Sequence, residues 1–256
     1  MAEEVLKSVE DIFHEAEDVD TTVLFDKMWG YLTELRGRIE TRFPDLSLDP
    51  SCDDLLDYEA PGGQAKGVLQ TWSGPGMDWL VHSHLGDPIK GFTNLHLTAW
   101  LGPEIAVPHL GIAWGTLPDL WFYVDLQPRS DLLVNTHELD TYFEPFNQRF
   151  LELREDDRFK TFVSRALYVR QAVSEIGLAY VIDRSEDMID TMFELTGETV
   201  DLWLEFIDNA PEVPMGERAA LAERDLAVRR TVAERDPANV LGVEFYGEEF
   251  TDRLVR

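Results

Sequence analysis

Apolar and polar positions follow a different spacing in each successive part of the chain. Residues 1–43 carry apolar side chains at helical spacing and predict two helices, the second of which begins at Thr21 and Thr22. Residues 44–66 are rich in proline, glycine and aspartate without a clear period, which indicates a loop. Residues 66–129 form short runs of valine, leucine and aromatic residues, separated by glycine, proline and aspartate. These runs predict about five strands of an antiparallel meander.

After residue 129 the spacing of apolar positions becomes helical again. The expected elements are two amphipathic helices, one strand and two further helices, over Glu138–Leu153, Asp156–Gln171, Leu178–Asp183, Ser185–Phe206 and Glu217–Glu234 in that order. Helices, then strands, then helices favour one α+β domain in which an antiparallel sheet lies between helical layers. We therefore expect a single domain over the whole chain.

Charge and composition narrow the range of partners. Fifty acidic residues against 22 basic ones give a net charge of −28, so nucleic acid is not an expected partner. The acidity fits either a well-solvated surface or a salt-adapted host. No run reaches the roughly 18 apolar residues of a membrane span. The one cysteine, Cys52, excludes an internal disulfide and a cysteine-only metal site, and we interpret it as a bystander in a reducing cytoplasm.

The usual cofactor and catalytic motifs are missing from the sequence. It contains no glycine-rich dinucleotide fingerprint after a strand, no phosphate loop and no nucleophile elbow. His82 and His84 are two residues apart, so on a strand they share one face, a spacing that can hold a metal. No third ligand is evident, and a histidine pair in the core or in a pocket is the alternative. We expect no metal.

Three segments carry a more specific signal. The first, residues 124–132, ends a strand in Asp-Leu-x-Pro-Arg-x-Asp-Leu. The second is residues 164–174, and the third is Arg224-Asp225 followed by residues 233–238 and Gly247. The first two segments resemble red chlorophyll catabolite reductase in order and nearly in spacing, and Trp79–Ser83 matches a strand of that enzyme. The third resembles the C-terminal signature of the wider ferredoxin-dependent bilin reductase superfamily.

The resemblance covers roughly residues 66–250, with residues 1–65 as an added helical segment and loop. It implies a three-layer α/β/α sandwich with a central antiparallel sheet, and a substrate held between the sheet and the C-terminal helices. The implied reaction is the reduction of an open-chain tetrapyrrole such as a bilin or a chlorophyll-derived catabolite. Ferredoxin would deliver single electrons and the protein would supply protons, with no bound flavin, metal or nicotinamide.

Two charged residues match functional positions of the resembling proteins. Arg170 is expected to clamp a propionate, because a guanidinium binds a carboxylate through two parallel hydrogen bonds. Its alternative is a surface arginine. Asp236 matches an aspartate beside the substrate, where burial against the pigment would raise its pKa as proton donation requires. Its alternative is a turn residue before Pro237.

One acid of the resembling proteins is missing. Its position on the strand over residues 108–114 is Ala113, and His109, on the same face of that strand, is a candidate for supplying protons instead. A capped core histidine is the alternative. Further substrate-binding candidates are apolar residues that would shape the slot and two weaker polar ones, and the whole set is Trp114, Val173, Ala113, His82 and His96.

The expected partners are the tetrapyrrole and ferredoxin. Ferredoxin is acidic, so long-range attraction to this acidic chain is not expected, and docking would need a local positive patch. Lys160, Arg165, Arg229 and Arg230 are candidates for that patch. The loss of the strand acid leaves a second function open, that of a non-catalytic tetrapyrrole carrier. A structural domain adapted to a saline habitat is the third.

Overall fold

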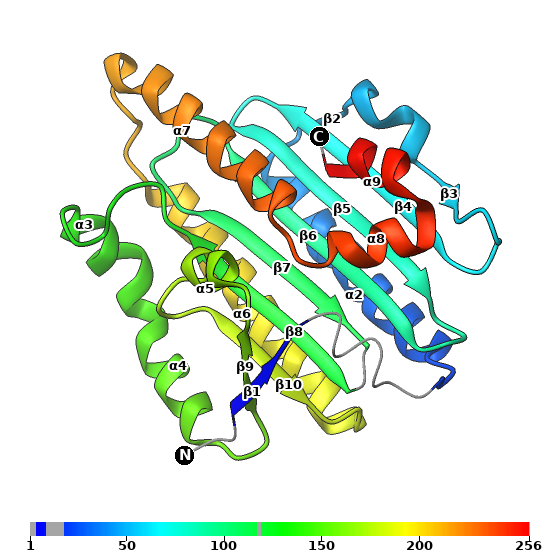
Figure 1. Cartoon of the computed structure of the whole chain (residues 1–256). Coiled ribbons are helices and arrows are strands. Elements are labelled where there is room, and N and C mark those ends of the chain that lie inside the picture. The colour runs from blue at the N-terminus through cyan, green and yellow to red at the C-terminus, as the bar shows by residue number, and fades with distance from the viewer. Residues whose placement is uncertain (1–3, 9–17, 117–118, 256) are drawn as a thin grey trace.

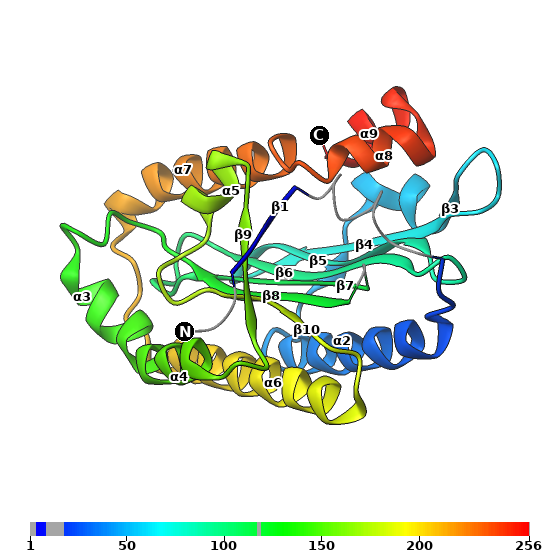
Figure 2. The ribbon, with the colours of Figure 1, turned by 60° about the horizontal axis from the view of Figure 1, so that its bottom comes forward.

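A ten-stranded sheet divides the molecule into two helical layers (Figures 1 and 2). The computed structural model describes residues 4–8, 18–116 and 119–255. The strands are β1 (Glu4–Lys7), β2 (Ser47–Leu48), β3 (Tyr58–Glu59), β4 (Lys66–Gly74), β5 (Met77–Asp87), β6 (Phe92–Leu101), β7 (His109–Gly115), β8 (Leu120–Gln127), β9 (Lys160–Ser164) and β10 (Leu178–Ile182). Their order is β1-β9-β10-β8-β7-β6-β5-β4-β2, with β3 beside β4. Only the β1–β9 pair is parallel among the described strands.

The helices are distributed over both faces of the sheet. They are α2 (Thr22–Arg42), the 3-10 turn η1 (Pro50–Leu55), α3 (Thr136–Glu138), the π-turn η2 (Leu139–Phe143), α4 (Glu144–Glu155), α5 (Leu167–Ala172), α6 (Glu186–Asn209), α7 (Met215–Glu234), α8 (Asn239–Tyr246) and α9 (Glu248–Val255). Figure 2 shows α2, α4 and α6 below the sheet and α5, α7, α8 and α9 above it. The expected α+β class and its layering are confirmed.

The two faces of the sheet are packed very differently. Below it, α2 buries Met28, Leu32, Leu35 and Ile39 completely, and α6 adds eleven buried residues. Above it, the 20-residue helix α7 has one buried residue, the charged Asp225. Apolar burial therefore holds the lower layer to the sheet, whereas α7 is attached mainly by polar contacts.

The sequence predictions are most accurate where apolar residues recur at a regular spacing. The five-strand meander is confirmed as β4 to β8, each paired antiparallel with the next. The second N-terminal helix is confirmed as α2, although the Thr21 hydroxyl donates to the carbonyl of Pro88 instead of capping the helix. Ser185 does cap α6, since its hydroxyl accepts from the Met188 amide.

Three element predictions are corrected. The expected helix over Asp156–Gln171 is strand β9 followed by the short α5, because residues 160–164 complete the sheet between β1 and β10. The first predicted N-terminal helix is wrong over residues 4–7, which form β1, and residues 9–17 lie outside the described residues. The predicted loop over residues 44–66 contains β2, η1 and β3.

Two expected substrate contacts lie on the lower face, away from the C-terminal helices. Trp114 is fully buried beside Tyr31 of α2 and Phe193 of α6. His82 is 1% exposed and stacks on Trp29 of α2, with ring centroids 3.7 Å apart. Neither side chain can line a slot on the upper face, so both assignments are corrected. His84 shares the face of His82, as its spacing predicts, and makes an edge contact with Trp29.

The buried histidines make stability depend on pH. Burial lowers the pKa of His82 to about 3, and that of His84 and of His109 to about 4. The unfolded chain takes up these protons near pH 6.5, so stability is full above that pH and falls toward pH 4. Burial also raises the pKa of Asp125 to about 6, which offsets part of the loss between pH 6 and 4.

We predict that His82→Phe, which preserves the stack on Trp29, flattens this dependence. Each buried neutral histidine contributes about 1.4 kcal/mol per pH unit across the window. Urea unfolding at pH 7, 6 and 5 measures the slope for both proteins, and His137→Gln at an exposed position is the control. An unchanged slope in His82→Phe would contradict the burial of a neutral imidazole.

Candidate active site

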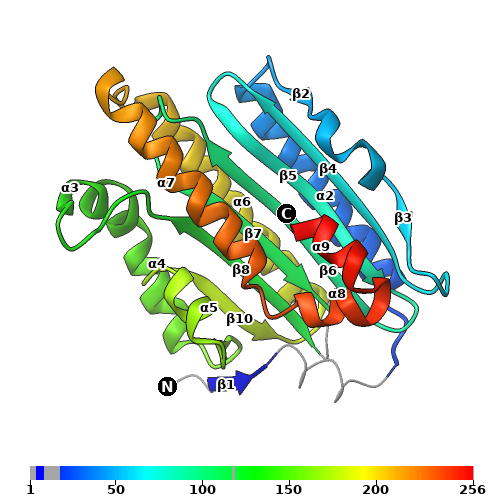
Figure 3. The ribbon, with the colours of Figure 1, turned by 45° about the horizontal axis from the view of Figure 1, so that its top comes forward.

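The upper face of β7 forms the floor of the candidate site. Side chains alternate along a strand, and His109 meets Asp225 of α7 whereas Trp114 meets α2 and α6. The residues of β7 that face α7 and α8 are therefore His109, Gly111, Ala113 and Gly115. Figure 3 looks onto this face, with α7, α8 and α9 in front of the sheet. Gly111, Ala113 and Gly115 have only a methyl group or no side chain, and we call the flat surface that they leave the strip.

A row of polar and aromatic residues crosses the sheet at Ala113. The strand register places Ser83, His96, Ala113 and Tyr123 directly opposite one another on β5, β6, β7 and β8. The Tyr123 ring lies over Gly111, where an added Cβ would be 3.3 Å from its Cε1 atom. A planar molecule on this strip would have the His96 imidazole on one side and the Tyr123 phenol on the other.

Asp236 faces this row from the loop between α7 and α8. Its Oδ1 atom accepts from the Ala238 amide at 2.8 Å, so the turn role before Pro237 that the sequence suggests is present. The same carboxylate also acts on His96. Burial lowers the pKa of His96, and the charge of Asp236 opposes that shift. Asp236 is therefore both a turn residue and one half of a polar pair that spans the space between sheet and helices.

Asp125 is a second carboxyl group on the upper face. It is 1% exposed and accepts from the Ser174 amide at 2.8 Å, the Ser174 hydroxyl at 2.5 Å, the Leu126 amide at 2.8 Å and the Tyr123 hydroxyl at 3.1 Å. Burial raises its pKa to about 6 although these donors lower it. Asp125 therefore fixes the loop after α5 and the Tyr123 ring together.

Val173 lies in that same loop, close to Asp125. An added Cβ at Gly177 would be 2.7 Å from the Val173 side chain and 2.8 Å from Oδ2 of Asp125, so only glycine allows this packing. Val173 is thereby placed at the β8 side of the strip.

Arg170 lies on α5, and its side chain reaches back to residues that precede the helix. It is exposed, and its Nη1 donates to the carbonyls of Ser164 at 2.7 Å and Arg165 at 3.1 Å. These contacts hold the guanidinium at the end of β9. The neighbouring Tyr168 ring lies 5.0 Å from the guanidinium carbon of Arg235, which brings α5 beside the end of α7.

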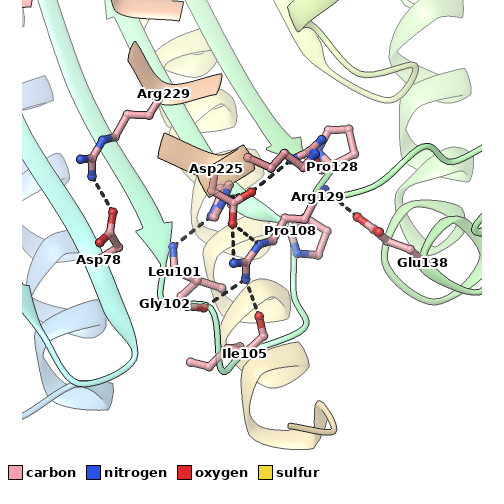
Figure 4. A network of polar contacts seen from close by, with 12 residues as sticks. Asp78, Leu101, Gly102, Ile105, Pro108, Pro128, Arg129, Glu138, Asp225 and Arg229 are labelled. Carbon is pink, nitrogen blue, oxygen red and sulfur yellow. Dashed lines mark hydrogen bonds and ion pairs between the residues drawn. The ribbon is translucent and has the colours of Figure 1, made fainter. Parts of the chain in front are cut away.

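A buried ionic network fastens α7 to the sheet (Figure 4). Asp225 accepts from Nη2 of Arg129 at 2.5 Å and from Nε at 3.0 Å, and Arg224 approaches its other oxygen at 3.1 Å. Arg129 also donates to the carbonyls of Gly102 and Ile105. Burial alone would raise the pKa of Asp225, but His109 and Arg129 hold it below its ordinary value.

His109 belongs to this network. Its Nδ1 accepts from the Leu101 amide at 3.0 Å, and its Nε2 lies 3.4 Å from Oδ1 of Asp225. The ring is 1% exposed, and burial lowers its pKa to about 4. A neutral, buried imidazole whose Nδ1 accepts a hydrogen bond and whose Nε2 lies close to Asp225 is the core histidine that the sequence left as the alternative. The geometry thus favours a positioning role over proton supply.

Sequence reasoning missed Tyr123 and Asp125. Both lie in the run over residues 120–126, where apolar side chains occupy nearly every position and hide the alternation. The signal that identifies them is the register, because Tyr123 pairs with Ala113 and Asp125 with Gly111. A nearby cavity of about 210 Å³ between α4, α6 and β8 is smaller than usual ligand pockets.

Comparison with solved structures identifies a similar fold. The crystal structure of selenomethionine phytochromobilin synthase from tomato in complex with biliverdin has a TM-score of 0.75 at 15% sequence identity. The similarity covers 91% of this chain and 81% of the tomato chain. The chain therefore shares the fold of that tomato protein. No curated protein sequence matches this chain.

The family is given by a second comparison. The family model for red chlorophyll catabolite reductase (RCC reductase) matches residues 30–256. Because the match covers most of the sequence, the chain belongs to the red chlorophyll catabolite reductase family. Within the described residues, no helix is both long and apolar enough to cross a membrane.

We predict that Asp225→Asn lowers the free energy of unfolding by about 3 kcal/mol, because it leaves the buried Arg129 without its counter-charge. Asp201→Asn is the matched control, since Asp201 forms an exposed pair with Arg38 and should change stability by less than about 1 kcal/mol. Urea unfolding at pH 7 measures both. Equal effects of the two variants would refute the fastening role of the network.

Proposed function

We propose that this chain reduces an open-chain tetrapyrrole that lies flat on the upper face of β6, β7 and β8. The observation that carries the proposal is the strip of Gly111, Ala113 and Gly115, bordered by His96 and Tyr123 and covered by the loop that holds Asp236. A conjugated pigment needs such a flat surface with hydrogen-bonding groups at its edges. The reductase family to which the chain belongs supports the same substrate class.

Asp236 is the proposed proton donor from the helix side. Its carboxyl group is partly buried and faces a histidine whose burial keeps it neutral, so His96 can hydrogen-bond to a pyrrole or lactam group while Asp236 delivers a proton. Electrons would come singly from ferredoxin into the pigment, whose conjugated system accepts them. The chemistry asked of the protein is then binding, orientation and proton supply.

Arg170 is the proposed propionate clamp. Its two bonds to main-chain carbonyls use Nη1 and set the direction of the guanidinium at the edge of α5. A guanidinium oriented in this way loses less freedom when it binds a carboxylate. Val173 on the following loop would contact the ring that carries the propionate.

An electron donor of acidic character would dock where cations gather beside the strip. Arg235 and Tyr168 join the end of α7 to α5. The exposed Arg230 and Arg170 lie on these two helices, and the exposed Arg165 lies just before α5. Arg229 contributes less than the sequence suggests, because it pairs with Asp78 at 2.8 Å and lies over the Trp79 ring. Lys160 lies at the opposite end of β9 from Ser164 and Arg165, so it is separated from this group by the length of the strand.

A pigment carrier is the second candidate function. The observation that favours it is the absence of a carboxylate at Ala113, in the middle of the floor. The two functions separate in one assay, in which the purified protein is mixed with biliverdin, reduced ferredoxin, ferredoxin reductase and NADPH. A reductase progressively bleaches the long-wavelength band, whereas a carrier shifts the band once and then leaves it constant.

We predict that Asp236→Asn still binds biliverdin but loses at least about 100-fold in turnover, because the amide cannot donate a proton. Asp183→Asn is the control, since Asp183 also accepts from an amide two residues on, at 2.8 Å, but on an exposed turn. The bleaching rate measures turnover. Turnover at the wild-type rate in Asp236→Asn would exclude its proposed role.

We predict the opposite pattern for Arg170→Gln. Losing one charged hydrogen-bonding partner of the propionate should weaken pigment binding about tenfold or more and leave the rate at saturation nearly unchanged. A titration followed by the visible spectrum gives the dissociation constant. Arg158→Gln, which removes an exposed arginine paired with Asp156, is the control. Unaltered binding in Arg170→Gln would show that the propionate lies elsewhere.

A further inference from the structure

Tyr123 occupies the place beside the floor where an acid on β7 is missing. It pairs with Ala113 across β7 and β8, and it is partly exposed on the face toward α7 and α8. Its ring rests on the bare backbone of Gly111, with the phenol oxygen 3.7 Å from where a Cβ would be. A side chain at Gly111 would displace the ring, so the small residues of β7 give Tyr123 its position over the strip.

The phenol is joined to a buried carboxyl group. Tyr123 donates to Oδ2 of Asp125 at 3.1 Å, and the Ser174 hydroxyl lies 2.5 Å from Oδ1. Two of the four donors to Asp125 are main-chain amides, and the other two are hydroxyl groups that can rotate. When Asp125 carries a proton, one hydroxyl can turn from donor to acceptor, which opens a path from the carboxyl group to the phenol oxygen.

We propose, on the basis of the function proposed above, that Tyr123 is a catalytic residue that protonates the reduced pigment from the sheet side and is re-protonated by Asp125. One electron from ferredoxin converts the pigment to its radical anion. The O–H bond of Tyr123 then breaks, and its proton forms a new bond to the pigment. The carboxyl proton of Asp125 passes to the Tyr123 oxygen, which leaves a neutral pigment radical, neutral Tyr123 and an Asp125 carboxylate.

The second half of the reduction uses the other side of the site. A second electron from ferredoxin and a second proton, from Asp236, complete the addition of two electrons and two protons. The two proton sources thus lie on opposite borders of the strip, one on β8 and one on the α7–α8 loop. Asp125 acts through Tyr123 and is a positioning residue, because its own oxygens are enclosed by Ser174, Leu126 and Tyr123.

The test is the single-atom substitution Tyr123→Phe in the full chain, assayed with biliverdin and reduced ferredoxin. We expect pigment affinity within about twofold of wild type, turnover lower by at least about 100-fold, and accumulation of the pigment radical in electron paramagnetic resonance spectra. Tyr180→Phe is the matched control. Tyr180 is a buried tyrosine on the lower face whose hydroxyl has no hydrogen-bond partner among the residues that the structure describes, so the turnover of Tyr180→Phe should equal that of wild type.

The role of Asp125 is tested by Asp125→Asn and by the double variant. If Asp125 acts only through Tyr123, the turnover of the double variant Tyr123→Phe/Asp125→Asn should be no lower than that of the single variant Tyr123→Phe. A further tenfold loss in the double variant, with pigment binding retained, would overturn that coupling. Turnover of Tyr123→Phe within twofold of an active wild type would overturn the catalytic role alone. An inactive wild type would overturn the reductase proposal and this inference together.

Discussion

The alternation of side chains across one sheet separates two environments on which the rest of this structure depends. Each residue of β7 faces either the apolar layer of α2 and α6 or the lightly packed layer of α7 and α8. Trp114 takes the first side and is fully buried, while Ala113 takes the second and lies in the candidate floor. Stability therefore comes mainly from one face, which leaves the other available for a ligand.

The upper helical layer is nevertheless held on the sheet, and an ion pair between α7 and the segment just after β8 holds it there. The ion pair of Asp225 and Arg129 is enclosed and completed by carbonyl acceptors, so its desolvation cost is offset by several hydrogen bonds at once. His109 joins this network as a neutral ring. A helix held mainly by polar contacts can cover a pigment without filling the space that the pigment needs.

The sequence indicates the fold where the hydrophobic period is clear. The runs that become β4 to β8 and the stripe of α6 were readable because apolar positions recur at the spacing of their elements. Strand β9 was not, because its five residues are ordered by pairing with β10 and with β1, which lies far away in sequence. Tertiary pairing overrides local helical preference there.

The candidate site depended on register that a sequence does not show. His82 and His96 look equivalent as polar residues on adjacent strands, yet His82 pairs with Leu97 and His96 with Ser83, so the two rings face opposite sides of the sheet. Asp236 was found through the resemblance to a known family and His96 only as a weaker polar candidate, and the structure brings the two within electrostatic range. Tyr123 and Asp125 became visible only when β8 was aligned with β7.

A crystal structure of the protein with bound biliverdin tests the central claim most directly. The account predicts density for four coplanar or gently twisted rings over Gly111 and Ala113, with the Asp236 carboxyl group and the Tyr123 hydroxyl at opposite edges of the pigment. Density on the lower face, or a pigment outside the layer between the sheet and α7, would contradict it.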